Sequence, residues 1–283
     1  MLWQGRRESS NVEDRRGVSA GGLAVGGGVI GVIVVVLNLL LGGDTSQIPP
    51  ELLPGQQQAR QLSPAEDSAE NMRASFVKVV LAETEDVWTN IFRQKGMQYP
   101  EPTLVLFRDA VQSGCGSASA ASGPFYCPGD HKLYIDLSFY EELQDRFHAP
   151  GDFAMAYVVA HEVGHHVQTL LGTSQKLARA RQTMDEADYN RMSVKLELQA
   201  DFLAGVWAHF ANRAKILEAG DIEEALTAAN AIGDDRLQKE AQGRVVPDAF
   251  THGTSAQRMY WFKKGYDTGD IAQGDTFSDP SLN

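Results

Sequence analysis

The sequence predicts an α+β fold that is mainly helical, contains a small sheet and is preceded by one N-terminal transmembrane helix. Three observations support this prediction. An apolar, charge-free run lies near the N-terminus, most of the later chain has apolar residues at helical spacing, and two short segments have the pattern of strands. We expect a single working domain over residues 64–266.

The composition is that of a globular chain with an acidic balance. The chain has 283 residues, of which 43% are hydrophobic and 22% are charged, so it is long enough to bury a core. It carries 25 Lys and Arg against 37 Asp and Glu, a formal net charge of −12. Because no basic surplus is present to neutralise phosphates, we expect no nucleic-acid partner.

Residues 18–42 are predicted to form a transmembrane anchor. Positions 23–41 are mostly Val, Ile, Leu and Gly, close to the about 20 apolar residues that a helix needs to cross a bilayer core. A cleaved signal peptide is the competing interpretation, but this run is long and the LGGDTSQIPP that follows is a poor cleavage site. Glycines at small-xxx-small spacing permit weak self-association through this helix, although such spacing arises easily by chance in a Gly-rich run.

The charges that flank the anchor predict its orientation. The basic residues before it are Arg6, Arg7, Arg15 and Arg16. After it, no Lys or Arg occurs until Arg60. The positive-inside bias therefore places residues 1–17 in the cytoplasm as a separate segment and the rest of the chain outside, as in a single-pass protein of the cytoplasmic membrane.

The elements of the domain follow in order after a linker at residues 43–63. Ser63, Pro64 and Glu66 have the pattern of a helix start, with a capping box and a proline in the first turn, and the helix should end near Gly96. Strands are predicted at Thr103–Phe107 and Lys132–Leu137. Helices are predicted at about 138–148, 152–171, 191–212, 221–240 and 254–265, followed by a polar tail at 267–283 that we expect to fray.

Cys115 and Cys127 lie in a loop of small residues between the two predicted strands. Two cysteines are too few for a disulfide-built scaffold or a four-thiolate zinc site. If the domain is exported, a disulfide between them is permitted, and we favour this bridge over two free buried thiols or a pair of metal ligands.

The strongest chemical signal is the motif His161-Glu162-Val163-Gly164-His165 in a strongly helical run. Residues four apart share a helix face, so His161 and His165 can hold one cation together. Glu162 then lies beside the metal-bound water rather than on the metal, the arrangement of a general base. His166 points off this face, and we interpret it as a packing residue or a support for the ligands.

A second helix contains acids on an otherwise apolar stretch. Glu197 and Asp201 are four residues apart in VKLELQADFLAGVWAHF, and buried acids are unfavourable unless they are paired or bind a metal. Glu197 is expected to be the third ligand of a Zn²⁺ ion, which suits two imidazoles and one carboxylate. Asp201 is expected to hydrogen-bond the far nitrogen of a ligand histidine, although the two acids could exchange these roles.

A third feature lies near the C-terminus, where His252 precedes a probable helix cap at Thr254 or Ser255. A histidine at such a loop-to-helix junction can reach over a metal site and stabilise an oxyanion.

Together these segments resemble the bacterial "putative neutral zinc metallopeptidase" family, a group of membrane-anchored HExxH proteins. The matching segments are the Arg-flanked anchor, CG…GPFYCP…LYID, HEVGHHVQ, LELQAD and THGTSAQR. More widely, the E-x-x-A-D motif and the T-H-x-x-x-x-x-R motif, which ends at Arg258, resemble the integral-membrane zinc proteases that include the prenyl-protein endopeptidases. Those proteins carry Pro where this chain has Gly253.

The resemblance implies a zincin-like metalloprotease domain with one Zn²⁺ per chain. It implies hydrolysis of peptide bonds in protein or peptide substrates on the extracytoplasmic side, as an endopeptidase, with Glu162 as general base. We expect a substrate to lie extended along an edge strand near Thr103–Phe107 or Lys132–Leu137.

Two other functions stay open from the sequence. One is a non-catalytic, membrane-tethered binding or assembly module with a structural zinc, which Glu162 argues against because a structural zinc needs no general base. The other is zinc amidohydrolysis of a non-peptide cell-wall substrate.

Overall fold

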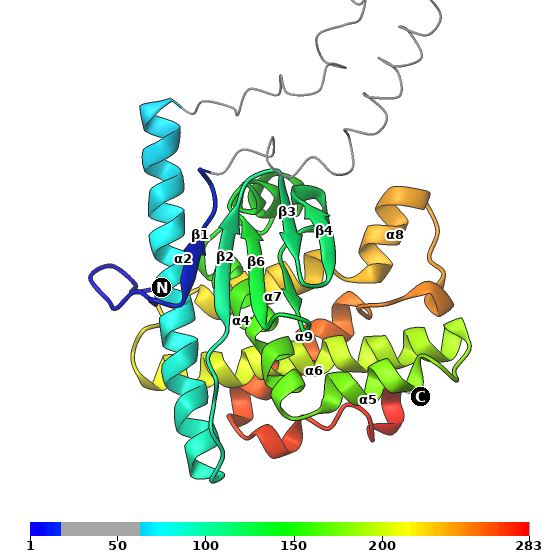
Figure 1. The fold of residues 1–283 in the computed structure, drawn as a ribbon. Helices are drawn as coiled ribbons and strands as arrows, with labels where there is room; N and C mark the ends of the chain where they lie inside the picture. The colour runs from blue at the N-terminus through cyan, green and yellow to red at the C-terminus, as the bar shows by residue number, and fades with distance from the viewer. Residues whose placement is uncertain (18–62, 283) are drawn as a thin grey trace, which may run out of the picture.

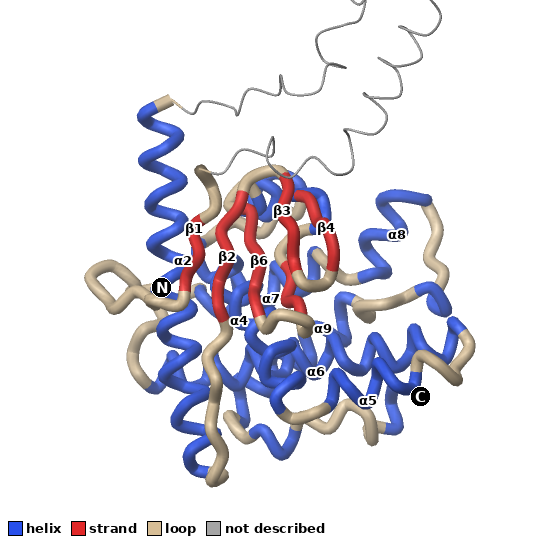
Figure 2. Tube along the Cα trace, in the orientation of Figure 1, coloured by secondary structure: helices blue, strands red, loops and turns tan. Residues whose placement is uncertain are grey.

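The computed structural model describes residues 1–17 and 63–282, and it is mainly helical with a small sheet, as predicted (Figure 1). The strands gather in one half of the molecule, and long helices lie below and behind them (Figure 2). Within the described residues, no helix is both long and apolar enough to span a bilayer. The predicted anchor at 18–42 and nearly all of the linker at 43–63 lie outside the described residues.

The main sheet has four strands in the order β1-β2-β6-β5. Its strands are β1 (Val12–Asp14), β2 (Thr103–Phe107), β6 (Lys132–Asp136) and β5 (Phe125–Cys127). β1, β2 and β6 are parallel to one another, and β5 is antiparallel to β6. The prediction of the two central strands is confirmed to within one residue, whereas β1 and β5 were not predicted.

Alternation along β2 divides the core into two parts. Leu104 and Leu106 face the main core shared with the helices, and Val105 and Phe107 face a smaller cluster on the opposite side of the sheet. This alternation follows from the two-residue period of a strand. The hairpin of β3 (Ala110–Ser113) and β4 (Gly116–Ser119) contributes Val111 to that second cluster. Both faces of the sheet are therefore covered.

The first long helix, α2, begins with the predicted capping box. The Ser63 side chain accepts from the backbone of Glu66, and the Glu66 side chain accepts from the backbone of Ser63. The other helices of at least eight residues in the described part are α4 (Asp152–Leu170), α5 (Thr173–Ala180), α6 (Glu186–Arg213), α7 (Asp221–Ala231), α8 (Asp234–Gln242) and α9 (Ser255–Thr268), and α2 spans Pro64–Gln94.

Some helix boundaries differ from those predicted. Residues 138–148 form a short helical turn (α3, Phe139–Glu141) and a π-helical turn at Glu142–Arg146. The single helix predicted at 221–240 is two helices, because the helix is interrupted near Gly233. A side chain at Gly233 would place its Cβ 2.4 Å from the backbone of Ser255, so this position is a close crossing of two segments.

Helices α6 and α9 approach each other through two glycines. A Cβ at Gly205 would lie 2.0 Å from the carbonyl oxygen of Phe262, and a Cβ at Gly265 would lie 2.0 Å from that of Phe202. Only glycine permits this backbone distance. The crossing fixes α9, and hence the loop before it that contains His252, against the helix that contains Glu197.

Both ends of the described chain contact the domain that was predicted at residues 64–266. Residues 1–17 are not a separate segment, because β1 pairs with β2 and Trp3 packs edge-on against Phe76. The tail does not fray, because the fully buried Thr276 donates to the carbonyl of Lys195 at 2.6 Å. The local sequence predicts polar ends that do not pack on the domain. In the structure both ends contact residues that are far away in the sequence.

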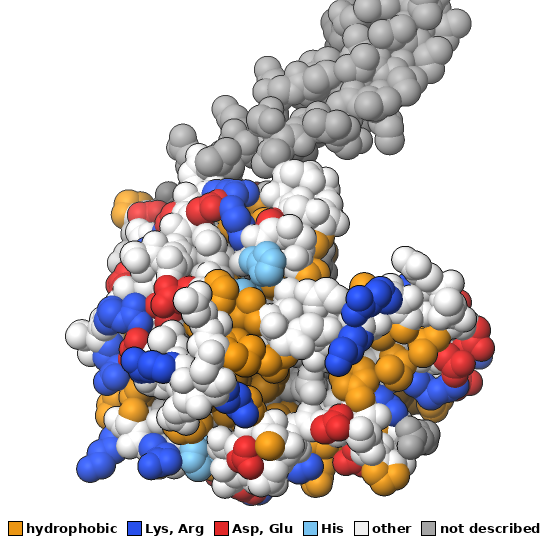
Figure 3. All heavy atoms as spheres, turned by 60° about the horizontal axis from the view of Figure 1, so that its bottom comes forward, with side chains coloured by type: hydrophobic (Ala, Val, Ile, Leu, Met, Phe, Trp, Pro, Cys, Tyr) orange, Lys and Arg blue, Asp and Glu red, His pale blue; other side chains and the backbone are white. Residues whose placement is uncertain are grey.

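Charged side chains of both signs are interspersed on the face seen from below in Figure 3, around a central area of hydrophobic side chains. The acidic net charge is therefore not expressed on this face as one large patch of a single sign.

Candidate metal centre

Helix α4 positions the two predicted histidine ligands. His161, Glu162 and His165 follow the apolar first half of α4, which is buried in the core. His161 and Glu162 are themselves buried, with 6% and 8% of their surface exposed. The rings of His161 and His165 lie with their centroids 4.8 Å apart, one turn along the same face.

Helix α6 brings the predicted third ligand to these histidines. The Oε2 atom of Glu197 lies 3.2 Å from Nε2 of His161 and 3.4 Å from Nε2 of His165. One potential ligand atom from each residue lies within 4.8 Å of the other two. Two imidazole nitrogens and one carboxylate oxygen converge on one point, which is a donor set that suits zinc with a position left for water.

The hydrogen bonds on the far side of each ring fit metal binding. Nδ1 of His161 donates to Asp201 at 2.8 Å, and Nδ1 of His165 donates to the side-chain oxygen of Gln168 at 2.9 Å. The amide nitrogen of Gln168 donates to the Leu196 carbonyl at 2.7 Å, which fixes its oxygen toward His165. Because both Nδ1 atoms carry a proton, both Nε2 atoms present a lone pair toward Glu197.

The glycine in the HExxH motif permits α6 to come this close. A Cβ at Gly164 would lie 3.0 Å from the carbonyl oxygen of Ala200 and 3.2 Å from its Cα. Ala200 lies in the same turn of α6 as Asp201 and one turn after Glu197. The contact between Gly164 and Ala200 therefore sets the distance from the histidines to their carboxylate partners.

Asp201 supports the site and does not face the convergence point. Its carboxylate accepts two hydrogen bonds from Arg258, at 2.9 and 3.0 Å, and one from the Tyr157 hydroxyl at 2.5 Å, in addition to that from His161. Burial opposes ionisation, but the charge of Arg258 outweighs it and lowers the pKa of Asp201 to about 2. With its oxygens occupied in this way, Asp201 contacts Nδ1, whereas Glu197 contacts Nε2.

Tyr157 and the role of Arg258 were missed in the sequence. Arg258 is 3% exposed and also donates to the carbonyl of Ile232. Tyr157 lies one turn before His161 on the same helix face, and that i−4 spacing was the available signal. In the sequence, Arg258 stands out only as the last residue of the T-H-x-x-x-x-x-R motif.

Glu162 lies beside the ligands and contacts the edge strand β5. The backbone N–H of Tyr126 in β5 lies close enough to its carboxylate to favour the ionised form. Burial raises the pKa of Glu162. A carboxylate with a raised pKa next to a metal position is suited to accept and return a proton.

His166 faces away from the convergence point, as predicted, and joins α4 to β5. Its Nε2 donates to the carbonyl of Pro100 at 2.7 Å, so Nδ1 accepts from the Tyr126 hydroxyl at 3.1 Å. Burial lowers the pKa of His166 to about 4, so the ring is neutral near pH 7. His166 therefore holds the side chain of the residue whose backbone contacts Glu162.

His252 lies at the loop before α9, near enough to Glu197 for their charges to interact. Its side chain is half-exposed, 3.4 Å from a carboxylate oxygen of Asp234 and 2.9 Å from the Thr251 hydroxyl. Gly253, which follows, has φ of +89°, a conformation that proline cannot adopt. The loop conformation thus explains why this chain departs from the related proline-containing motif.

The predicted disulfide is confirmed. Cys115, in the turn between β3 and β4, is bonded to Cys127 at the end of β5. The bridge therefore fastens the hairpin to the strand that contains Tyr126.

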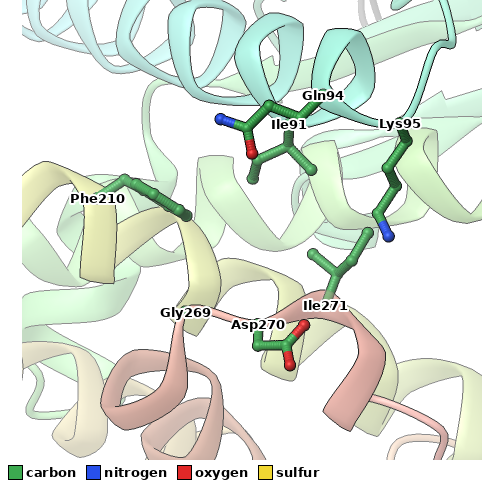
Figure 4. A pocket seen from close by; sticks show the side chains of 7 residues that line it. All are labelled: Ile91, Gln94, Lys95, Phe210, Gly269, Asp270 and Ile271. Carbon is green, nitrogen blue, oxygen red and sulfur yellow. The ribbon is translucent and has the colours of Figure 1, made fainter.

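Two other features lie apart from these residues. A pocket of about 290 Å³ lies between the end of α2, the end of α6 and the segment after α9, and its lining shares no residue with the metal centre (Figure 4). Asp152, Asp221 and Glu224 also gather closely, but the α-amino group of Met1 lies 3.0 Å from Asp152 and 3.2 Å from Asp221.

Comparison with known proteins agrees with the site. The chain is 52% identical to the Escherichia coli K12 protein named "Uncharacterized protein YpfJ", over 98% of this chain and 99% of that protein. It is 47% identical to the Mycobacterium tuberculosis H37Rv protein named "Uncharacterized protein Rv2575", over 65% of each chain. No solved structure matches significantly. The family model described as "Putative neutral zinc metallopeptidase" matches residues 1–277, and the chain therefore belongs to that family.

Proposed function

We propose that the chain is a zinc-dependent peptidase that hydrolyses peptide bonds of protein or peptide substrates. One observation carries the proposal. The Nε2 atoms of His161 and His165 and a carboxylate oxygen of Glu197 converge, while a separate buried carboxylate, that of Glu162, lies next to them. A site that only held a metal for stability would need the three converging ligands and not the fourth acid.

The roles follow from the positions of the residues. When bound by His161, His165 and Glu197, one Zn²⁺ would supply Lewis-acid polarisation of a peptide carbonyl and of the attacking water. Glu162 accepts the proton from that water and returns it to the leaving amine. Asp201 holds His161 in the tautomer that leaves Nε2 free. His252, in the loop before α9, would stabilise developing negative charge on the carbonyl oxygen.

The substrate edge differs from the two strands that were predicted. β2 is paired on both sides, with β1 and β6, and β6 is paired on both sides, with β2 and β5, so neither has a free edge. β5 is the outer strand, and the N–H of its central residue, Tyr126, points to Glu162. An extended peptide that paired with β5 would therefore pass directly by Glu162.

The Cys115–Cys127 disulfide supports placement outside the cytoplasm, because thiols are kept reduced in the cytosol. Anchoring by residues 18–42 and cleavage within a chain rather than from its end both remain predictions from the sequence.

The decisive experiment compares zinc content and peptide hydrolysis in three proteins. Glu162→Gln should keep one zinc per chain and the same fold but lose about 10²–10⁴-fold in turnover, because it cannot accept a proton. His161→Ala should lose the zinc itself. His252→Ala should keep zinc and substrate affinity and lose about 10²-fold in turnover.

The result also separates the alternatives. If Glu162→Gln restores a deletion phenotype as well as the wild type does, the chain acts as a binding or assembly module and not as a hydrolase. If Glu162→Gln abolishes hydrolysis of cell-wall amides while peptides are never cleaved, the chain is an amidohydrolase with the same zinc site.

A further inference from the structure

Residues 1–17 are an integral part of the folded domain. β1 extends the sheet as a parallel neighbour of β2, with Val12 opposite Leu104 and Asp14 opposite Leu106. The N–H of Leu104 donates to Asn11 and the N–H of Arg15 donates to Leu106, both at 2.8 Å. Without these residues, β2 would be left with an unpaired edge.

Side chains of this segment also enter the main core. The Met1 side chain is 5% exposed within the same cluster as the long helices, and the Trp3 ring contacts Phe76 of α2 with centroids 5.5 Å apart. The backbone N–H of Leu2 donates to the carbonyl of Ile216, 2.8 Å away. The segment therefore contacts three separate parts of the domain: α2, β2 and the chain after α6.

The four arginines that predicted the membrane orientation are engaged in ion pairs. Two of them bind α2: Arg6 lies 2.6 Å from Glu83, and Arg7 lies 2.8 Å from Glu85, a residue that is 2% exposed. The other two follow β1 and pair with acids of that strand, Arg15 with Glu13 and Arg16 with Asp14. The folded domain thus gives these charges a role that does not require a cytoplasmic location.

The chain leaves and re-enters the domain at neighbouring points. Arg16 donates to the side chain of Asn71 at 3.1 Å, and its carbonyl accepts from Arg108 at 3.0 Å. Asn71 lies seven residues after Pro64, the first residue of α2, which is about 10 Å along a helix. The segment that follows β1 and the start of α2 thus lie at the same end of the molecule, at the top in Figure 1.

We propose that residues 1–17 lie on the same side of the membrane as residues 63–282. A single crossing between residue 17 and residue 63 would separate them by a hydrocarbon core of about 30 Å, which is incompatible with pairing of β1 and β2. The end of the domain that holds residue 17 and the start of α2 is then the face directed to the lipid bilayer. The family model matches from residue 1, which agrees with an N-terminal segment that belongs to the domain.

Labelling of the full-length protein in bacterial cells tests this proposal. Ser10→Cys places a thiol at an exposed position of the N-terminal segment, and Ala178→Cys, exposed on α5, is the matched control. Each is treated with a membrane-impermeant maleimide in intact spheroplasts and again after lysis. If Ser10→Cys does not accumulate, Gln4→Cys, also exposed, replaces it.

We expect both cysteines to be labelled to the same extent in intact spheroplasts. Labelling of both only after lysis would also support a shared side, but it would overturn the proposed extracytoplasmic location of the peptidase. Labelling of Ala178→Cys in intact spheroplasts, with Ser10→Cys labelled only after lysis, would overturn the inference. None of these outcomes depends on whether the chain is a peptidase, because no activity is measured.

Discussion

Replacing Asp201 by Asn should separate the stability of the domain from its affinity for zinc. The substitution keeps the shape of the side chain but removes the charge that faces Arg258. Both groups are buried, with Asp201 0% and Arg258 3% exposed, and they share two hydrogen bonds. Leaving one member of a buried ion pair alone costs about 3–5 kcal/mol. For a domain of this size we expect a fall in Tm of roughly 6–20 °C.

The same substitution weakens the support of His161, and zinc affinity should fall by about 10–100-fold. Thermal unfolding of the zinc-free protein measures the first effect, and competition with a chelator of known affinity measures the second. The double variant Asp201→Asn with Arg258→Met removes the stranded cation. It should regain most of the stability, since an apolar replacement of similar size is tolerated in place of a buried pair, but none of the zinc affinity.

The reasoning is refuted if Asp201→Asn unfolds within about 1 °C of the wild type and binds zinc equally well. A double variant as unstable as the single one would also contradict it, since the cost would then not arise from the unpaired arginine.

The pH dependence of stability supplies an independent check. The pKa of Asp201 is lowered to about 2 in the folded state, below the about 3.9 of an unfolded aspartate. Its contribution is therefore complete above pH 4 and is lost as the pH falls toward 2, a loss on the order of 2–3 kcal/mol. Unfolding free energies of wild type and Asp201→Asn should converge over this range, and parallel curves would contradict the assignment.

Three further substitutions probe the surroundings of the site. Gly164→Ala should push α6 away from α4 and lower the affinity for zinc. Unchanged affinity would show that the contact between the two helices does not set the distance between the ligands. Tyr126→Phe leaves Nδ1 of His166 unsatisfied, so we expect a loss of about 1–3 kcal/mol in unfolding free energy with zinc content unchanged. Replacing Cys115 and Cys127 by Ser should lower stability by about 3 kcal/mol, measured by denaturant unfolding against the disulfide-bonded wild type.

The grouping of His161, His165 and Glu197 was predictable because its determinants are local. The i, i+4 spacing in HEVGH places two imidazoles on one helix face whatever surrounds the helix. Glu197 and Asp201 were found because acids are rare on an apolar helix face, and their spacing is again one turn. What the sequence could not show was the contact between Gly164 and Ala200, since it joins two helices that are separated in the chain by an entire additional helix.

The strands were harder to predict than the ligands. β5 is three residues long and is defined by its pairing with β6 and its disulfide, so no alternation was long enough to detect. The strands at 103–107 and 132–136 were predicted correctly, but whether a strand is central or at an edge depends on pairing. The substrate edge was therefore assigned to strands that are both enclosed.

The N-terminal arginines show most clearly where local patterns become ambiguous. Basic residues before an apolar run predict a cytoplasmic N-terminus, and the same residues can instead be one half of a set of ion pairs. The local sequence around Arg7 does not distinguish these two roles, because the carboxylate that pairs with it, that of Glu85, lies 78 positions away. In the structure that carboxylate is buried against the N-terminal segment and also accepts from Ser9 and Asn11. A charge reversal at Arg6, tested alone and together with Glu83→Arg, should therefore give non-additive changes in the stability of the full-length protein. Additive changes would mean that the two segments do not meet there.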